Sequence, residues 1–232
     1  MLRSGLWPAS VVVLAWSLTG CSALWRAGWE TVKPTFQNSS TAVDRLALEP
    51  GQPVLKFSVN GHYALLALGY VDRGTEVWYS ADGSVVRLRD GRLEGTDGLS
   101  VDWKNVASRD AALLPGANAP VTYTRVRDEM PGYRIQLEER VRILPLHSAP
   151  SAAPKALRQP AVRWFREEVV PDPAAGGWWT TRGKPYRYPG LYGWDVSVQP
   201  ARLVFGSQCL AKEVCVTWEP RVNRAAPVGA TR

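Results

Sequence analysis

The sequence has few of the side chains on which most enzymes depend, since only two histidines and three cysteines occur in 232 residues. Neither His62 nor His147 stands in a zinc spacing such as His-Glu-x-x-His. A Gly-x-Ser-x-Gly elbow, a phosphate-binding loop and a dinucleotide fingerprint are also missing. Asp97 and Asp102 are two carboxylates, as a glycosidase needs, but the sequence does not show that they face each other across a cleft. Acids beside a turn usually hydrogen-bond to their own backbone. We therefore expect no catalytic residue, no metal and no cofactor.

The N-terminus has no apolar run of the roughly 20 residues that cross a bilayer. The apolar stretch at 6–18 is interrupted by Pro8 and Ser10 and follows the basic Arg3. A basic start, a short apolar centre and small residues at the exit are typical of a secretory signal peptide. The exit at 18–21, LTGC, resembles the bacterial lipobox, where signal peptidase II cleaves before a lipid-modified cysteine. The alternative is an ordinary signal peptide with a chance cysteine.

The lipobox resemblance implies that residues 1–20 are removed and that Cys21 carries a diacylglyceryl group and a further acyl chain such as palmitate. Each buried methylene contributes about 0.8 kcal/mol, so two or three chains hold a protein firmly on a membrane. Ser22 follows the cysteine, whereas Asp at that position retains enterobacterial lipoproteins in the inner membrane. We therefore expect an outer-membrane lipoprotein that faces the periplasm.

Two cysteines remain once Cys21 is lipidated, namely Cys209 and Cys215. The periplasm is oxidising, and the five residues between the two cysteines allow a hairpin or turn that brings the sulfurs together. A redox-active pair is more often spaced Cys-x-x-Cys, and no histidine is near enough in sequence to suggest a metal site. The sequence therefore predicts a structural disulfide between Cys209 and Cys215.

Long helical stripes are missing after about residue 36, and strand patterns take their place. In PVLKFSV, residues 53–59, apolar and polar residues alternate with the two-residue period of a half-buried strand. The more continuously apolar HYALLALGYV, residues 62–71, predicts a buried strand. Tight turns between antiparallel strands are predicted at the Asn-Gly and Asp-Gly pairs 60–61, 82–83, 90–91 and 97–98.

A longer strand pattern follows between residues 133 and 143, where one parity is apolar and the other is charged. This predicts one long strand, or two strands in line, with a buried face. The members of that face would be Tyr133, Ile135, Leu137, Val141 and Ile143. Enough strands are present that the sheet should curl into a barrel or a sandwich to hide its edges.

The patterns divide the chain into a signal peptide, an anchor segment with a short helix and a linker, a β-rich periplasmic domain and a disordered tail, at 1–20, 21–44, 45–220 and 221–232. The short helix is expected over about 22–36, before Pro34 ends it. Residues 145–160 are rich in Pro, Ala and Ser and predict a long surface loop or linker. The fold class is therefore mainly β and antiparallel.

The chain is basic, with a formal net charge of +7 that becomes +6 when Arg3 leaves with the signal peptide. A basic periplasmic protein meets anionic lipid, lipopolysaccharide or acidic polysaccharide rather than nucleic acid. Residues 171–194 interleave aromatic side chains, which stack on sugar rings, with basic ones, which pair with carboxylates or phosphates. Alternatively, these aromatics cover the core at one end of a barrel. Candidate contacts with a glycan or a partner are Trp178, Trp179, Arg182, Tyr186, Arg187, Tyr188 and Tyr192.

One stretch carries a resemblance to a known family. VWYSADGSVVRLRDGRLEGTDGL, residues 77–99, combines Trp78, an Asp-Gly turn, a Gly-Arg-Leu triplet and Thr96 before a Gly-Leu pair. Behind a lipobox and in a β-rich chain, it resembles the YjbF/GfcB family of outer-membrane lipoproteins, which are associated with capsule and exopolysaccharide production. The similarity is expected to extend from about Cys21 to Trp218. It implies a barrel-like or strongly curved antiparallel fold and no catalytic residue.

The leading hypothesis is a lipid-anchored, non-enzymatic accessory or binding factor in capsule or exopolysaccharide assembly and export. It would contact acidic polysaccharide or a polysaccharide-export protein. One alternative is a carrier that shelters a lipid or lipoprotein acyl chain in a half-open β-barrel, which needs an open cavity lined by Leu, Val and Trp. Another alternative is a purely structural envelope lipoprotein.

Overall fold

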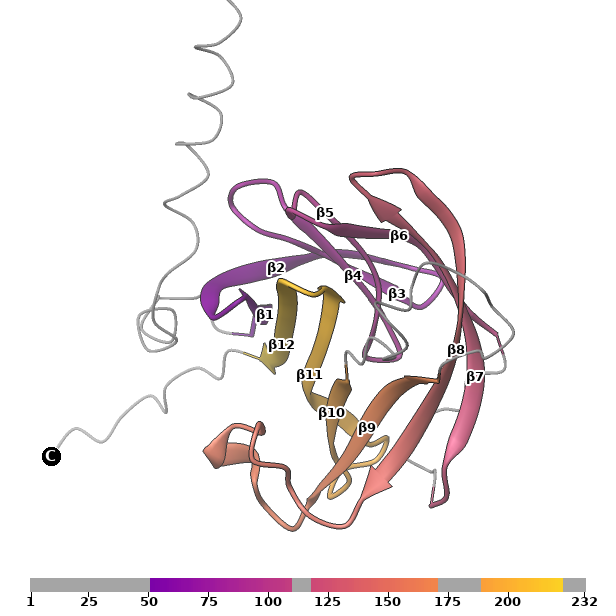
Figure 1. The fold of residues 1–232 in the computed structure, drawn as a ribbon. Helices are drawn as coiled ribbons and strands as arrows, with labels where there is room; N and C mark the ends of the chain where they lie inside the picture. Colours follow the sequence, from indigo (N-terminus) through magenta and orange to yellow (C-terminus); the bar gives the residue numbers. More distant parts are fainter. Residues whose placement is uncertain (1–50, 110–117, 171–188, 223–232) are drawn as a thin grey trace, which may run out of the picture. The chain divides into compact units, whose positions relative to one another are not determined.

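The computed structural model of the chain describes residues 51–109, 118–170 and 189–222. In these residues one antiparallel sheet of twelve strands forms a nearly closed barrel (Figure 1), which confirms the mainly β prediction. The predicted helix over about 22–36 and nearly all of the predicted tail lie outside the described residues. The strands are β1 (Pro53–Val59), β2 (His62–Asp72), β3 (Thr75–Tyr79), β4 (Val85–Arg89), β5 (Arg92–Asp97), β6 (Asp102–Arg109), β7 (Val121–Met130), β8 (Arg134–Leu146), β9 (Val162–Val170), β10 (Gly190–Asp195), β11 (Arg202–Ala211) and β12 (Val214–Val222).

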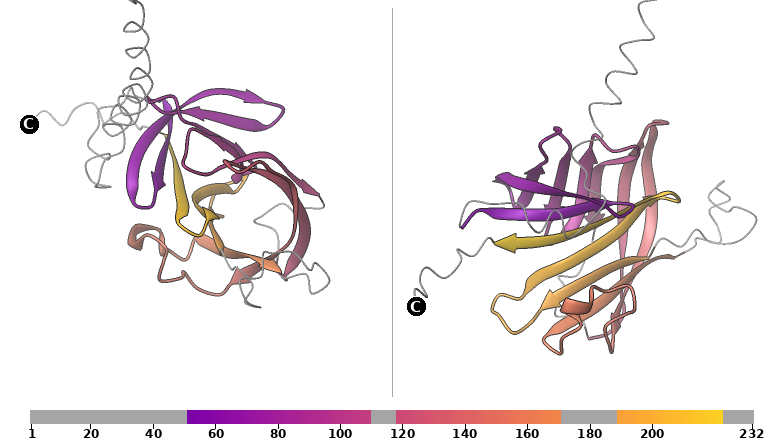
Figure 2. Two further views of the ribbon diagram at one scale, coloured as in Figure 1. Left: turned by 45° about the horizontal axis from the view of Figure 1, so that its top comes forward. Right: turned by 90° about the vertical axis from the view of Figure 1, so that its left-hand side faces the viewer.

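The strands follow one another around the barrel in chain order, with one exception. The hydrogen-bonded order is β5-β4-β3-β2-β1-β12-β11-β10-β9-β8-β7-β6. β1 pairs with β12, with Phe57 opposite Trp218, so strands from the two ends of the domain lie side by side (Figure 2). At the seam between β5 and β6, Thr96 Oγ1 donates to Asp102 Oδ1 at 2.8 Å and accepts the Trp103 N–H at 3.3 Å. Side chains therefore bridge the edges that the backbone ladder leaves open.

The predicted turns join consecutive strands. Asn60-Gly61, between β1 and β2, has φ angles of 50° and 82°, and Asp90-Gly91, between β4 and β5, has 48° and 71°. Positive φ at both central residues is the geometry of two-residue hairpin turns. Arg73-Gly74 forms a further turn of this kind between β2 and β3, with φ angles of 46° and 86°. An arginine in the position that Asn or Asp usually occupies hid this turn from the sequence pattern.

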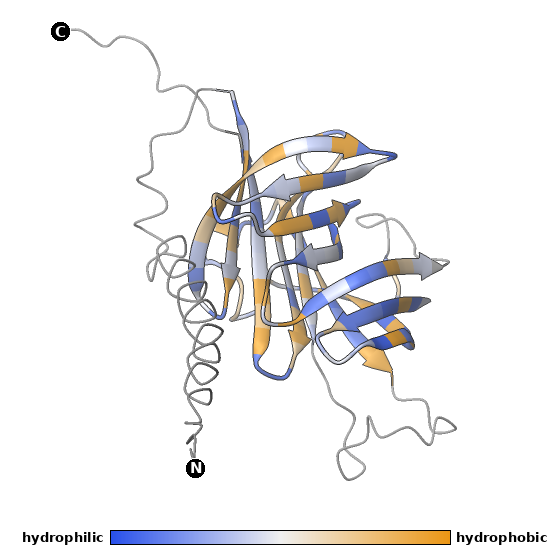
Figure 3. Cartoon of the chain, turned by 90° about the horizontal axis from the view of Figure 1, so that it is seen from above, coloured by the Kyte–Doolittle hydropathy of each residue, from blue (hydrophilic) through white to orange (hydrophobic). Residues whose placement is uncertain are grey.

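The inward-facing apolar side chains pack into one core. Trp218 lies over Gly206, where an added Cβ would stand 2.0 Å from the indole ring. The Trp218 indole also donates to the Gly91 carbonyl at 3.1 Å, which ties β12 to the turn between β4 and β5. Figure 3 shows the matching alternation of apolar and polar residues along the strands. The largest fully buried side chains include Trp103, Trp164, Trp218, Tyr192, Phe57 and Phe165.

Two faces that the sequence predicts as buried are only partly so. β8 is one continuous strand, but Tyr133 and Ile135 are 81% and 52% exposed, whereas Val141 and Ile143 are buried. β9 pairs with β8 only from Arg140 onward, so among the described residues no strand lies beside the earlier part of β8 on that side.

β2 shows the same effect, because β1 pairs with it only as far as Ala67. Only Ala64 and Leu66 of this predicted buried strand lie in the core, and residues 69–72 are exposed. The prediction of a buried strand is therefore right for Ala64 and Leu66 and wrong for residues 69–71, because a continuous apolar sequence does not show where the neighbouring strand ends.

The segment at 145–160, predicted as a surface loop or linker, packs onto the outside of the barrel. β8 runs to Leu146, and a short 3-10 turn, Lys155–Leu157, follows in the returning chain. Ala153 from this segment joins Trp164, Leu191 and Phe205 in a second, smaller core. The segment is therefore part of the domain, since it covers apolar side chains on the outer faces of β9, β10 and β11.

The disulfide predicted from the cysteine count is present in the structure. Cys209 on β11 and Cys215 on β12 are directly opposite each other in the hairpin register, and their sulfurs are bonded. The link closes the hairpin whose second strand pairs with β1.

Candidate functional site

Most of the sequence-predicted site residues lie outside the described residues: Cys21, Trp178, Trp179, Arg182, Tyr186, Arg187 and Tyr188. Tyr192 is described, and the structure corrects the expectation of a surface contact. Its side chain is 1% exposed and belongs to the barrel core, because alternate residues of β10 face inward. Its hydroxyl donates to Glu167 Oε2 at 3.1 Å. Tyr192 thus agrees with the alternative in which some of these aromatics belong to the core.

A network of charged and polar side chains lies inside the barrel beside the apolar core. Arg125 on β7 donates through Nη1 to Glu167 Oε1 at 2.6 Å and through Nη2 to Glu139 Oε2 at 2.8 Å. Tyr123 donates its hydroxyl to Glu167 Oε2 at 2.9 Å, beside the bond from Tyr192. Buried charges are tolerated when they are paired and hydrogen-bonded in this way.

The network continues toward the β7–β8 hairpin through Arg127. This side chain donates through Nη2 to Glu139 Oε1 at 2.7 Å and through Nη1 to Glu129 Oε2 at 2.9 Å. The guanidinium carbons of Arg125 and Arg127 lie 4.7 Å and 4.2 Å from the Trp103 ring centre. Cation–π contacts of this kind add to the ion pairs when the groups are desolvated.

The electrostatics keep Glu139, Tyr123 and Tyr192 each in one protonation state. Burial acts to raise the pKa of Glu139, but the charges of Arg125 and Arg127 outweigh it and lower this pKa to about 2. Burial, and next the charge of Glu167, raise the pKa of both Tyr123 and Tyr192 well above the usual range. Glu139 therefore stays ionised and the tyrosines stay protonated near neutral pH. This suits a structural network better than general acid–base catalysis.

The sequence patterns concealed this network because its charges occupy the inward parity of their strands. Glu139 has the same parity as Val141 and Ile143, and Arg125 has the same parity as Tyr123. A charged residue in the register of a buried face was the available signal. The apolar residues of that face outnumber Glu139 and mask this signal in the sequence pattern.

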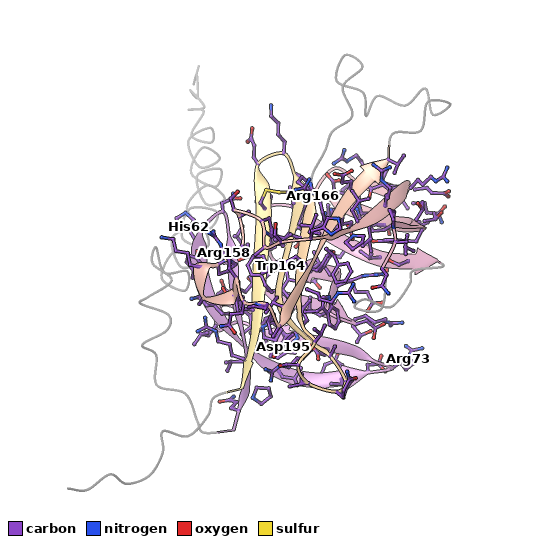
Figure 4. All side chains as sticks on the ribbon, turned by 90° about the horizontal axis from the view of Figure 1, so that it is seen from below. His62, Arg73, Arg158, Trp164, Arg166 and Asp195 are labelled. Atoms are coloured by element: carbon purple, nitrogen blue, oxygen red, sulfur yellow. A yellow bond between two sulfur atoms is a disulfide. The ribbon has the colours of Figure 1, made fainter. Side chains whose placement is uncertain are left out.

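A groove of about 520 Å³ lies on the outer face of the wall formed by β9–β12. Arg166 on β9, labelled in Figure 4 beside Trp164 of the same strand, contributes to the groove together with Glu168. The Glu168 carboxylate lies 3.2 Å from Arg142 Nη2 and 4.0 Å from Arg166 Nη1. The other residues that line the groove include Pro150, Ala152, Leu191, Phe205, Ser207 and Thr217.

The groove lies beside the ends of the segment that carries the predicted contacts. β9 ends at Val170 and β10 begins at Gly190, so residues 171–189 connect two strands whose side chains line the groove. Apolar lining with a few convergent polar groups is typical of sites that bind small molecules or chain segments.

The described residues contain no group of three or more His, Cys, Asp or Glu side chains that could hold a metal ion. In the same part of the chain, no helix has the length and apolarity to cross a membrane.

These features define the class of protein: an up-and-down antiparallel β-barrel with a packed interior and a groove on its outer wall. The chain belongs to the family described as group 4 capsule polysaccharide lipoprotein GfcB, YjbF, whose family model matches residues 36–156. The match includes the stretch at 77–99 that carried the resemblance and ends before the segment at 171–188.

The fold is similar to the crystal structure of the hypothetical lipoprotein YmcC from Escherichia coli (K12). The TM-score is 0.55 at 15% sequence identity, and the similarity covers 79% of this chain and 94% of that chain. At this identity the likeness shows a shared fold. No curated protein matches the chain.

Proposed function

We propose that the protein is a lipid-anchored, non-enzymatic factor in the assembly or export of capsule polysaccharide. Membership of a capsule polysaccharide lipoprotein family is the observation that carries this proposal. The lipobox at 18–21 supports an anchor on Cys21, and Ser22 supports the outer membrane with the domain on its periplasmic face.

The outer groove is the proposed contact for a glycan or for a component of the export machinery. Leu191 and Phe205 form a largely buried apolar floor, Arg166 and Glu168 offer charge, and Ser207 offers a hydroxyl group. The candidate contacts at 178–188 belong to the segment that begins and ends beside this groove, and we propose that they extend the same binding surface.

The carrier alternative receives less support. Sheltering an acyl chain requires an open interior lined by Leu, Val and Trp, whereas these side chains pack against one another in the described strands. The buried charges of Arg125, Arg127 and Glu167, with the Glu139 carboxylate paired to the two arginines, also make the remaining interior a poor solvent for a hydrocarbon chain.

A genetic complementation experiment tests the proposal. Deletion should lower the amount of polysaccharide at the cell surface, and the wild-type chain should restore it. Ser207→Trp, which places an indole in the groove without removing a core side chain, should restore it poorly. Thr122→Trp, at an exposed site on β7, is the matched control and should restore it fully. Unchanged surface polysaccharide in the deletion strain would refute the proposed process, and full restoration by Ser207→Trp would refute the role of the groove.

A further inference from the structure

Two exposed tyrosines lie next to each other on the outer face of the barrel, away from the groove. Tyr70 on β2 and Tyr79 on β3 are 53% and 40% exposed, although tyrosine rings usually cover apolar surface. Their ring centres are 6.5 Å apart, and the ring planes meet at 42°. Neighbouring exposed aromatic rings are unusual enough to indicate a site of interaction.

A β-bulge places this pair on the outer face. The register between β2 and β3 shifts between Leu68 and Tyr70, so Tyr70 pairs with Val77 on the outer side. The Tyr79 ring lies directly over Gly69, where an added Cβ would stand 2.5 Å from the ring. Desolvation, and next a hydrogen bond with Tyr70, raise the pKa of Tyr79. The two rings are thus held against the backbone and against each other.

Polar groups continue the same surface across β4, β5 and β6. Arg87 and Lys104 both pair with the carboxylate of Asp97. Lys104 also lies 4.0 Å from Asp102, so the two cations are matched by two carboxylates. Desolvation, and next the charge of Arg87, lower the pKa of Lys104, which agrees with its crowded position. The result is a balanced set of fixed donors and acceptors beside two aromatic faces.

We propose that Tyr70 and Tyr79, flanked by Arg87, Asp97 and Lys104, form a glycan-binding platform for uncharged sugar units of a polysaccharide chain. This inference rests on the proposed function, since it supposes that the protein works on a polysaccharide. Aromatic faces stack on the apolar faces of sugar rings, and the paired charged groups hydrogen-bond hydroxyls. The sheet wall gives a long chain room to lie across several strands.

The charge balance favours this occupant over a lipid surface. A surface that binds anionic lipid carries an excess of Lys and Arg beside its apolar residues. Here the cations are already paired with Asp97 and Asp102, so they attract an anionic membrane weakly. Hydroxyl groups need no counter-charge, and they accept and donate hydrogen bonds equally well. A sugar chain therefore matches both the rings and the polar groups.

Affinity electrophoresis of the full chain, purified in detergent, tests this platform. The probe is surface polysaccharide extracted from the cells that make the protein. Combining Tyr70→Ala with Tyr79→Ala should weaken binding roughly tenfold or more, because two stacking faces are lost. Tyr70→Phe with Tyr79→Phe keeps the rings and should retain most of the binding. Tyr133→Ala, at a side chain that is 81% exposed, is the matched control and should leave binding unchanged.

Binding should also survive about 0.5 M salt, where charge attraction is screened over a few ångströms. Absence of wild-type binding, equal binding by the double alanine variant, or loss of binding in salt would each overturn the platform. A double alanine variant that loses attachment to anionic liposomes and keeps polysaccharide binding would overturn it as well. The proposed function is judged separately, by the surface polysaccharide of the deletion strain and by Ser207→Trp. All three variants, the double alanine, the double phenylalanine and Tyr133→Ala, should unfold like the wild type, which a thermal melt checks.

Discussion

The interior ion network makes a sharp prediction for Glu139→Gln. The substitution keeps the size of the side chain and removes its charge. Arg125 and Arg127 then remain buried, each with one carboxylate partner fewer. A guanidinium group that loses a partner in the interior keeps its full desolvation cost, so the folded state should be strongly destabilised.

The magnitude follows from the depressed pKa of Glu139. Its value of about 2 lies below the ordinary 4.5, a difference of about 2.5. At about 1.36 kcal/mol for each pKa unit, the ionised carboxylate contributes about 3 kcal/mol to the free energy of unfolding. Breaking a buried ion pair costs about 3–5 kcal/mol, which agrees. In a domain of this size the melting temperature should fall by roughly 10 °C.

The same group gives the wild-type protein a pH dependence in acid. Because the folded pKa lies below the unfolded one, the contribution of Glu139 is fully present above about pH 5 and is lost as the pH falls toward 2. The Glu139→Gln variant lacks this contribution at every pH. The difference in unfolding free energy between the two proteins should therefore shrink steadily between about pH 5 and pH 2.

Urea unfolding followed by tryptophan fluorescence, repeated across this pH range, measures both effects. Glu138→Gln is the matched control, because Glu138 directly precedes Glu139 on the same strand and its side chain is exposed. The control should change the unfolding free energy by less than about 0.5 kcal/mol. If Glu139→Gln were no more destabilising than Glu138→Gln at pH 7, the reasoning about the network would be refuted.

Three further predictions concern the anchor, the hairpin link and the core. Cys21→Ser should abolish labelling with radioactive palmitate and leave the precursor uncleaved at this site; a mutant that is still cleaved and membrane-bound by fractionation would refute the anchor. Replacing Cys209 and Cys215 by serine should lower the unfolding free energy by about 2 kcal/mol, since the closed loop is short, and an unchanged urea midpoint would contradict this. Gly206→Ala should destabilise by about 1–3 kcal/mol, because its Cβ would overlap the Trp218 indole, and an unchanged melting temperature would contradict that close contact.

Local sequence signals predicted local structure well in this chain. Asn60-Gly61 and Asp90-Gly91 mark real hairpins, because those residues accept the positive φ angles that the turns require, whereas Asp97-Gly98 joins the two unpaired edges of the sheet. The choice between a barrel and a sandwich depended on pairings between distant segments, above all β1 with β12. Alternation along one strand carries no record of which strand lies beside it, so closure of the sheet was beyond the sequence pattern.

The candidate sites were less predictable for a related reason. Tyr70 belongs to an apolar run whose pattern predicts a buried strand, but the bulge at Gly69 turns it outward. Glu139 stands between the exposed residues Glu138 and Arg140, yet its parity places it inside. The bulge decides that Tyr70 faces outward, and the pairing with Arg125 and Arg127 allows the Glu139 charge to face inward. Both features depend on how the strands pair in three dimensions.

The pairing of β1 with β12 also determines when the barrel can form. Phe57 and Trp218, which face each other across this pair, are separated by 160 intervening residues of chain. A chain that crosses a membrane from its N-terminus delivers β1 first and β12 last. The first strand therefore waits for nearly the whole domain before its second edge is covered, and a polypeptide cut short before β12 leaves that edge open to other chains. The hairpin carrying the disulfide completes the structure, so under the proposed export its oxidation would be the last step.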